Sequence, residues 1–478
     1  MKYRIIMLAA AALVCWTAEA KVPLEIVGGT HPTTLKMTRI IGKTEPGATA
    51  MVNNQPVKVY ATGCFGAEVE LKQGLNDIKV YVKKGDDYNE QVVHVACNPQ
   101  KQTPPKVEPV MRDVMFNVTT LPGAFLQYGN GTDRLGGSKM GYIDADIPLR
   151  VVGDYDNLYK VQLAQNRFAY IQKEYAKMAD VEVKTVNTSS ISYSNIGKRD
   201  RVNVYLPCRL PYSSVTQLDP TAICVDIYGA MNNSNWISQH GDLGIIDYVD
   251  FRQLDSDVFR VFIKLKTNHA WGYHVEYKGN TLVIDVKHEP NLTLKGMTIG
   301  LDAGHGGDDS PGAIGHSGLE ERTINLQLVN LVKGMLEATG AKVVLSRDGD
   351  YGVSMADRRK VFVDADVDLM LAVHNNSGGS PLEDQGSSTY YKYTTNRPLA
   401  ATMLKHLTGI GLKNSGLTGN FNFSLGMTTE CPNALLEVLF MSSLPDEEKL
   451  CNDGWRKKIA SSIVAGVEDY LQQCKSNR

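Results

Sequence analysis

The spacing of apolar residues changes near Leu294, and this change constrains the fold more than any other feature of the sequence. Before it, short alternating runs separated by turn residues predict strands. After it, strand-like runs at 298–301, 342–345 and 369–373 alternate with apolar positions at helical spacing. Such alternation is typical of an α/β domain with a mixed, largely parallel sheet. We therefore expect a multidomain chain, with three small all-β domains followed by an α/β domain over residues 294–478.

Further elements of the expected α/β domain follow from the same patterns. Apolar residues from 324 to 335 predict a first helix that stops at Gly340, and 355–363 predicts a second helix. Strands are expected at 389–391 and 434–436, and a closing helix at 447–473. Ligands of such sheets bind beyond the carboxyl ends of the strands, so residues that directly follow a strand are the candidates for chemistry.

The β-rich part of the chain reads as three successive units. Residues 21–100 resemble an immunoglobulin-like β-sandwich, and a polar, proline-rich linker follows. Residues 106–185 resemble a bacterial SH3-like β-barrel, through an apolar strand, an acidic turn and a strand flanked by aromatic residues. Such barrels often bind wall peptides, although a structural spacer fits this unit equally well. Residues 186–290 form a third β-rich unit with strand candidates at 202–206, 222–227 and 282–286, and they resemble an envelope-targeting domain.

Residues 1–20 predict a secretory signal peptide, which is excluded from the fold. They combine the basic Lys2 and Arg4, a short apolar stretch, and a small-x-small site that ends at Ala20. No later segment has the length and apolar character of a membrane span. Since Lys+Arg 50 nearly balance Asp+Glu 52, a dedicated nucleic-acid binder is excluded. We expect an exported protein of the periplasm or cell envelope.

Seven cysteines follow the predicted signal peptide, and an oxidising compartment permits disulfides between them. Cys64 with Cys97, and Cys208 with Cys224, are plausible pairs within single domains. The last three cysteines cannot all pair with one another, and the sequence does not choose among them. Cys431 is disfavoured as a nucleophile because no histidine or asparagine partner accompanies it.

Two histidines follow strands of the predicted parallel sheet. His305 follows the first strand among glycines, and His374 follows the third. Glu320 and Glu321 open the first helix at the same edge of the sheet. A lone histidine in such a loop is more often a structural residue. Two imidazoles and one carboxylate, however, are typical ligands of a catalytic zinc ion that keeps a fourth position for water.

Glu437 is the fourth residue of the candidate site. It lies in the otherwise apolar run 433–441, where a buried carboxylate requires a partner. A water molecule at the metal would be such a partner. The alternative is a glutamate at a sheet edge that faces solvent.

The stretch from about 296 to 474 resembles the zinc-dependent N-acetylmuramoyl-L-alanine amidase family of bacterial cell walls. The resemblance lies in ordered pieces: Leu301–Gly307, Pro311–Ala313, Gly318–Arg322, Val344–Arg347, Arg358, Ala372–Asn376 and Leu435–Val438. It implies His305, Glu321 and His374 as zinc ligands and Glu437 as the catalytic residue. Glu321 is preferred over Glu320 because a basic residue follows it, although Ser310 lengthens the preceding loop relative to the family pattern.

The resemblance also implies a peptidoglycan hydrolase. Zinc-activated water would cleave the amide bond between N-acetylmuramic acid and L-alanine, with Glu437 as general base and acid. A zinc peptidase that cuts within the stem peptide and a non-catalytic wall-binding regulator are the alternatives. Arg347 and Arg358 match the family pattern too, and a structural ion pair is favoured over substrate binding. The stretch between His374 and Glu437 leaves no room for an autoinhibitory helix, so we expect an open site.

Overall fold

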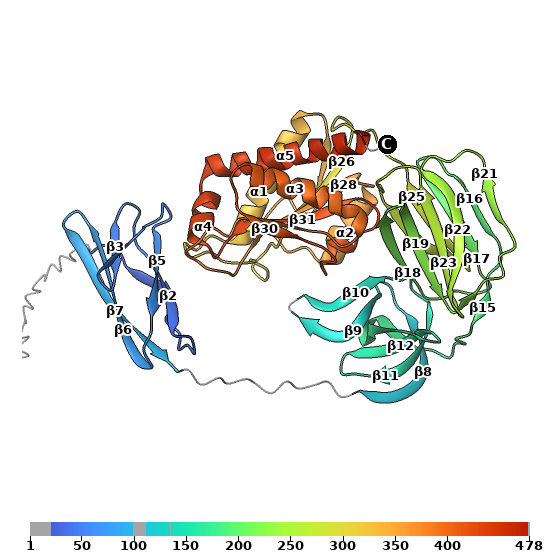
Figure 1. The fold of residues 1–478 in the computed structure, drawn as a ribbon, viewed down its shortest axis with the longest axis horizontal. Coiled ribbons are helices and arrows are strands. Elements are labelled where there is room, and N and C mark those ends of the chain that lie inside the picture. The colour runs from blue at the N-terminus through green and yellow to red at the C-terminus, as the bar shows by residue number, and fades with distance from the viewer. Residues whose placement is uncertain (1–20, 99–110, 134, 477–478) are drawn as a thin grey trace, which may run out of the picture. The chain divides into compact units, whose positions relative to one another are not determined.

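The computed structural model describes residues 21–98, 111–133 and 135–476. The predicted signal peptide and most of the predicted linker lie outside these described residues. The chain divides into two compact units between Lys101 and Gln102 (Figure 1). Within the described ranges, no helix is long and apolar enough to cross a membrane.

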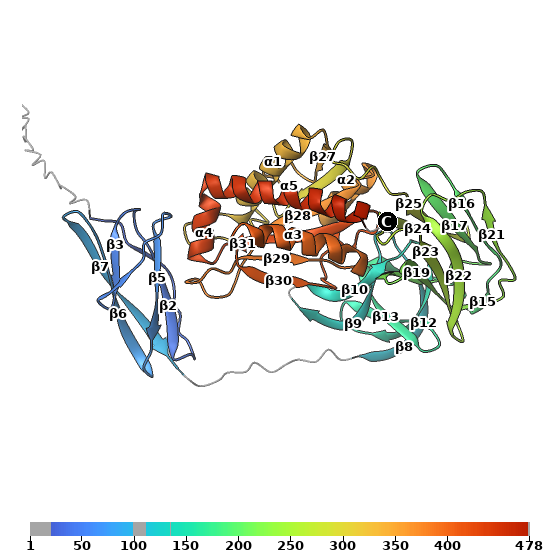
Figure 2. The ribbon, with the colours of Figure 1, turned by 45° about the horizontal axis from the view of Figure 1, so that its top comes forward.

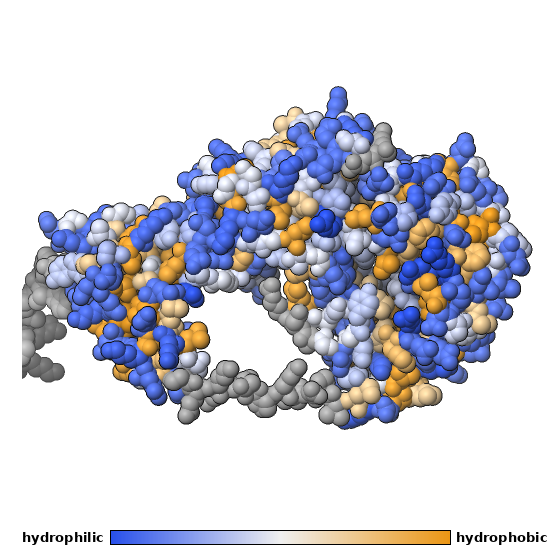
Figure 3. Space-filling model, in the orientation of Figure 1, coloured by the Kyte–Doolittle hydropathy of each residue, from blue (hydrophilic) through white to orange (hydrophobic). Residues whose placement is uncertain are grey.

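The first unit is built from two antiparallel sheets that face each other across a small core. The first sheet contains β1 (Glu25–Gly28), β2 (Met37–Lys43) and β5 (Cys64–Glu70). The second contains β4 (Gln55–Val57), β3 (Thr49–Val52), β6 (Gly74–Lys84) and β7 (Asp87–Cys97). Ile40, Phe65 and Val80 are fully buried between them. Apolar residues also reach the visible surface of this unit (Figure 3), and Leu35 and Leu75 are among the exposed ones.

The second unit begins with β-rich structure. One antiparallel sheet contains β10 (Gly136–Tyr142), β9 (Phe125–Asp133), β13 (Arg167–Gln172), β12 (Leu158–Ala164), β11 (Pro148–Asp154), β8 (Arg112–Thr120) and β14 (Ala176–Met178). The short helix η1 (Lys173–Tyr175) lies between its last two strands in the chain. We refer to this sheet, residues 111–178, as the hairpin sheet, after the β9–β10 hairpin.

Two further sheets and a short strand pair follow. One contains β21 (Ile237–His240), β16 (Ile191–Asn195), β17 (Arg199–Tyr205), β25 (Thr281–Lys287) and β24 (Tyr273–Lys278). The other contains β18 (Tyr212–Leu218), β19 (Thr221–Tyr228), β23 (Val258–Leu265) and β22 (Ile246–Asp255), and β15 (Val186–Asn187) pairs with β20 (Ala230–Met231). One continuous hydrophobic core joins these sheets to the hairpin sheet. The family likenesses and boundaries expected for the β units stay predictions.

The C-terminal part contains a six-stranded sheet covered by helices. In spatial order its strands are β27 (Lys342–Leu345), β26 (Thr298–Ala303), β28 (Leu369–Asn376), β31 (Asn433–Phe440), β29 (Ser387–Tyr390) and β30 (Asn414–Thr418). The first four strands are mutually parallel, β29 is antiparallel to β31, and β30 is parallel to β29. The helices are α1 (Glu321–Ala338), α2 (Met355–Asp364), α3 (Arg397–Gly409), α4 (Leu444–Cys451) and α5 (Asp453–Ser476), with short η2 (Thr394–Asn396) and η3 (Leu425–Met427).

The helices cover the two faces of this sheet unequally (Figure 2). On one face, α1, α3 and α5 pack together over Val373 and Leu436 in a shared core. On the other face, Phe362 of α2 packs with Met370. Because neighbouring residues of a strand point to opposite faces, His374 lies on the α2 face, opposite to Val373.

The closing helix differs from the single helix expected over 447–473. The chain forms α4 and then α5, because Asn452 adopts an extended conformation between them. The Ser443 side chain accepts a hydrogen bond from the Asp446 amide at the start of α4, and the Asn452 side chain accepts one from the Trp455 amide. Helix α3, which the patterns did not predict, packs against α5 and the sheet.

Neither expected disulfide forms, because Cys97, Cys208 and Cys224 carry free thiols. The proposed partners lie on different structural elements: Cys64 begins β5, whereas Cys97 ends β7 of the other sheet. Burial raises the pKa of the Cys431 thiol to about 12, which agrees with its exclusion as a nucleophile.

Candidate metal and catalytic site

The loop that follows β26 carries His305. The backbone turns back directly after the strand, and His305 itself has a φ of 63°, a left-handed conformation that is uncommon for residues other than glycine. The two glycines that follow also have positive φ angles. The turn leaves the His305 side chain 30% exposed beyond the carboxyl end of the sheet.

Two buried arginines hold this loop. Arg358 forms an ion pair of 2.6 Å with Asp302 and donates to the carbonyls of Ala303 and His305. Arg347 donates to backbone carbonyls only, among them those of Ala303 and Gly304. The expected structural ion pair is therefore present for Arg358, but it is wrong for Arg347, which has only backbone carbonyl partners among the described residues. Leaving either guanidinium unmatched would bury an uncompensated charge.

Glu321 lies at the start of α1 and is 3% exposed. Its Oε2 atom is 3.2 Å from Nε2 of His305, and its Oε1 atom is 3.1 Å from Nδ1 of His374. The neighbouring Glu320 instead forms an ion pair with Arg322 at 2.7 Å. The geometry therefore favours Glu321 over Glu320 as the carboxylate of this cluster.

His374 lies within β28 and contacts both other members of the cluster. Its ring centre is 5.0 Å from that of His305. Its other neighbour is Phe423, whose ring packs edge-to-face at 5.6 Å. The Nε2 atom of His374 is buried and has no hydrogen-bond partner among the described residues.

Two glycines make this convergence possible. A Cβ atom on Gly304 would lie 2.3 Å from the His374 ring. A Cβ atom on Gly312, whose φ is 74°, would lie within 2.8 Å of both Glu321 and His305. Since such distances are far below van der Waals contact, any larger residue at either position would displace a member of the cluster.

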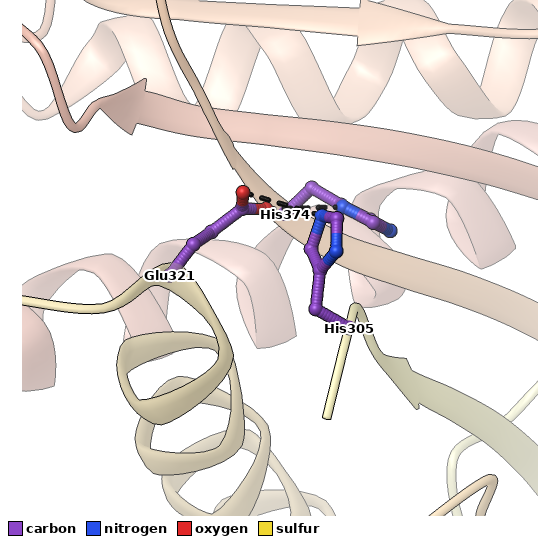
Figure 4. Close-up of side chains that lie close together, drawn as sticks. All are labelled: His305, Glu321 and His374. Carbon is purple, nitrogen blue, oxygen red and sulfur yellow. Dashed lines mark hydrogen bonds and ion pairs between the residues drawn. The ribbon is translucent and has the colours of Figure 1, made fainter. Parts of the chain in front are cut away.

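The cluster has the composition of a zinc site. His305, Glu321 and His374 each offer one ligand atom within 4.8 Å of the others. Figure 4 shows the three side chains pointing toward one another from the loop after β26, the start of α1, and β28. Two nitrogen donors and one oxygen donor match the preference of zinc, and the unpartnered Nε2 atom of His374 is compatible with a ligand there.

The electrostatics of the cluster favour a cation. Burial raises the pKa of Glu321, but hydrogen bonds with His305 and His374 outweigh this and hold the pKa well below its usual range. Burial lowers the pKa of His374, but the hydrogen bond with Glu321 and the charge of Glu437 raise it overall. A carboxylate that stays ionised in a buried position is suited to a metal ion.

Glu437 lies beside this cluster. It is directly opposite His374 in the parallel pair β28–β31 and opposite Ser388 in the antiparallel pair β31–β29. The three side chains therefore form one row across the sheet, on the α2 face. The sequence-based choice of Glu437 thus places an acid next to a candidate metal ligand.

Several neighbours of the site gave no recognisable sequence signal. Asn325 and the Asn375 backbone amide both donate to Oε1 of Glu321, and the two asparagine side chains are hydrogen-bonded to each other at 2.8 Å. Tyr390 accepts a hydrogen bond from Ser388, and its ring lies 4.4 Å from that of Phe421. The position of Asn325 one helical turn after Glu321 was the available clue, since residues four apart share a helix face.

Comparisons with known proteins find similarity over the C-terminal part of the chain. Residues 299–469 match the N-acetylmuramoyl-L-alanine amidase family. The chain is 31% identical over 185 residues to the uncharacterized protein YqiI of Bacillus subtilis, spanning 38% of this chain and 87% of YqiI. It is 33% identical over 201 residues to the N-acetylmuramoyl-L-alanine amidase LytC of the same organism, spanning 41% of this chain and 40% of LytC.

A solved structure is also similar. The catalytic domain of CwlV, an N-acetylmuramoyl-L-alanine amidase from Bacillus (Paenibacillus) polymyxa var. colistinus, is 30% identical. The match covers 37% of this chain and 98% of that domain, with a TM-score of 0.35. The matched share of this chain is therefore well below half in each comparison.

Proposed function

Through residues 299–469, the chain belongs to the N-acetylmuramoyl-L-alanine amidase family, and from this premise we propose that His305, Glu321 and His374 hold a zinc ion at which Glu437 assists amide hydrolysis. The substrate is the bond between N-acetylmuramic acid and the L-alanine of the stem peptide. The observation that carries the proposal is the convergence of three ligand atoms within 4.8 Å, next to the row that contains Glu437.

The residues divide the chemistry between them. A bound zinc ion supplies Lewis acidity, which polarises a carbonyl and eases the deprotonation of water. Glu437 accepts the proton of the attacking water and delivers it to the leaving nitrogen of L-alanine. The carbon–nitrogen bond breaks, leaving a carboxylate on the muramoyl lactyl group and a free amine on the peptide. Asn325 and the Asn375 amide fix the Glu321 carboxylate by hydrogen bonds at 3.2 Å and 3.1 Å.

The site also fits an enzyme that works without an autoinhibitory segment. Helix α3 lies between His374 and Glu437 in the sequence, but Thr389 donates to its Ala400 carbonyl, so α3 covers the face opposite to Ser388. We propose that the mature enzyme is exported to the cell envelope and that its β-rich units place it on the wall.

Mass spectrometry of digested, purified peptidoglycan tests this function. An amidase releases stem peptides with L-alanine at the amino end and leaves intact glycan strands. A peptidase would release shorter peptides, and a non-catalytic regulator would release none. Either of these outcomes, with stoichiometric zinc bound, would contradict the proposal.

A further inference from the structure

Tyr390 is the last residue of β29, on the face of the sheet that carries Glu437. It follows Ser388 by two residues, so the side chains of both lie on the α2 face. Its ring packs on that of Phe421, with the ring centres 4.4 Å apart. Because the ring is held by this contact, the hydroxyl group is the part of the side chain that can act on a substrate.

The Tyr390 hydroxyl extends toward the carboxyl edge of the sheet. Its oxygen accepts a hydrogen bond from Oγ of Ser388 at 3.1 Å and a longer one from Nδ2 of Asn376 at 3.5 Å. Ser388 is opposite Glu437, and Asn376 follows His374 by two residues in β28. The hydroxyl oxygen therefore lies next to the row that contains His374, Glu437 and Ser388.

These two contacts place the hydroxyl above β31. Neighbouring strands lie about 4.8 Å apart, so β28 and β29, which flank β31, are about 10 Å from each other. An atom that contacts side chains of both flanking strands lies over the strand between them. Glu437 belongs to that strand and faces the same side, and it is half-buried like Tyr390. The phenol and the proposed general base therefore border the same space.

The hydroxyl has a proton that no described residue accepts. In both hydrogen bonds its oxygen is the acceptor, and a phenol can donate a bond as well as accept. The proton is therefore available to an acceptor on a bound substrate. Since Glu437 takes the proton of the attacking water, the carbonyl group under attack must lie beside Glu437, within the space that the phenol borders.

We propose that Tyr390 is a further catalytic residue, whose hydroxyl donates a hydrogen bond to the carbonyl oxygen of the scissile amide. This inference rests on the proposed function, because it takes the muramoyl–L-alanine amide as the substrate. When water adds to the carbonyl carbon, an electron pair of the carbon–oxygen double bond moves to the oxygen, which becomes an anion. The hydroxyl keeps its proton and stabilises that charge, so it contributes more in the transition state than in the bound substrate.

The matched variants are Tyr390→Phe and Tyr391→Phe in the full-length, zinc-loaded protein. Tyr390→Phe removes only the hydroxyl and keeps the ring that packs on Phe421. Tyr391 is the next residue, and its side chain packs against the core beneath α1, α3 and α5 instead. It controls for the loss of a phenol hydroxyl from this segment.

Steady-state hydrolysis of a soluble muramoyl-peptide measures the effect on the reaction. Tyr390→Phe should lower kcat by about 100-fold to 1,000-fold, as the removal of one oxyanion donor does, with little change in KM. Zinc content should equal that of the wild type, and Tyr391→Phe should keep wild-type kcat. Wild-type kcat in Tyr390→Phe would overturn the role. A loss of zinc that accounts for the loss of kcat would overturn it too, because Tyr390 would then only support the site.

Calorimetry with a phosphinate analogue of the scissile bond tests the contact without turnover. The wild type and Tyr391→Phe should bind it about 100-fold more tightly than Tyr390→Phe, because its anionic oxygen takes the place of the oxyanion. The same ratio is expected when Glu437→Gln is added to each protein, whereas a hydroxyl that acted only through Glu437 would lose its effect there. Equal binding in either background would overturn the contact.

Wall digestion separates this inference from the proposed function. If the wild type and Tyr390→Phe release stem peptides at the same rate, only the role of Tyr390 is refuted. If the wild type releases none, the amidase itself is refuted.

Discussion

The two imidazoles of the candidate site are held in different ways. His374 lies within β28, 9% exposed, in a strand with paired neighbours on both sides. His305 lies on a loop in a left-handed conformation, and its side chain is 30% exposed. The sheet fixes the backbone of the first, whereas the backbone of the second depends on Arg347 and Arg358, which bind the loop's carbonyls. One side of the site is therefore built by secondary structure and the other by buried guanidinium groups.

Removing the support of the loop should give the largest effect. Arg358→Met leaves the fully buried Asp302 without its cation, which costs about 3–5 kcal/mol of unfolding free energy. It also releases the His305 carbonyl, so zinc affinity should fall by about 10–100-fold. Chemical denaturation and zinc titration measure the two effects.

Lys360→Met is the control for this prediction. Lys360 lies on the same helix and pairs with Asp364, but both side chains are mostly exposed. Its loss should change stability by less than about 0.5 kcal/mol. If the two variants had similar stability and zinc affinity, the loop would not depend on Arg358.

The next variants compare the two sides of the site through their glycines. Gly304→Ala places a methyl group against the immobile His374 ring, and Gly312→Ala places one against His305 and Glu321. Because β28 cannot yield, we expect Gly304→Ala to lower zinc affinity more strongly, by about 100-fold against about 10-fold. Zinc competition with a chromogenic chelator measures the difference.

Gly334→Ala serves as the reference substitution. Gly334 lies within α1, and nothing is within 4 Å of its added Cβ atom. Alanine should keep zinc affinity and stabilise the helix by up to about 1 kcal/mol. If Gly312→Ala lost more zinc affinity than Gly304→Ala, the His374 side of the site would not be the more rigid of the two.

Asn375→Ala tests the hydrogen bonds behind the ligands. The Asn375 side chain links the Asn325 side chain to the Leu439 amide, so its loss loosens Glu321 without removing a ligand. We expect about a tenfold loss of zinc affinity. Wild-type zinc affinity in Asn375→Ala would show that these hydrogen bonds do not hold the ligand set.

The smallest effect concerns pH and the strand that carries Glu437. Glu430 lies just before β31 and is hydrogen-bonded to His274. This bond raises the pKa of His274, although burial opposes the shift. Burial raises the pKa of Glu430, but the same bond helps to lower it overall. The His274 contribution is complete below the ordinary histidine pKa of 6.5 and fades as pH rises through the raised value. The Glu430 contribution is complete above the ordinary glutamate pKa of 4.5 and fades as pH falls through the lowered value.

His274→Gln should therefore destabilise the protein more at pH 6 than at pH 9. The His274 side chain is 41% exposed, so solvent screening limits the difference to below about 1 kcal/mol. Urea denaturation at both pH values measures it. A greater loss at pH 9 would contradict the sign of this linkage.

The site was more predictable than its surroundings, for physical reasons. Local patterns mark its residues: glycines next to His305, an apolar strand before His374 and a helix start at Glu321. Because these patterns alternate as in a parallel sheet, they predict that the three residues lie at the same edge of that sheet. Glu437 was found because a carboxylate in an apolar run is unusual. The family resemblance is confirmed by the comparisons, whereas the zinc and catalytic roles of these residues stay predictions.

What the sequence did not reveal depends on contacts between distant segments. The Asn422 contact with Lys139 joins residues that are 283 positions apart, and no local pattern marks either one. Helix α3 was not predicted, although its buried Leu399, Met403 and Leu407 recur at helical spacing.

Zinc content and peptide release, measured together on Glu437→Gln and His305→Ala, test the central claim most directly. We predict that Glu437→Gln keeps one zinc ion per chain and loses turnover by about 100-fold to 10,000-fold, since only proton transfer is removed. His305→Ala should lose both zinc and turnover. Wild-type turnover in Glu437→Gln, or full zinc occupancy in His305→Ala, would contradict the account.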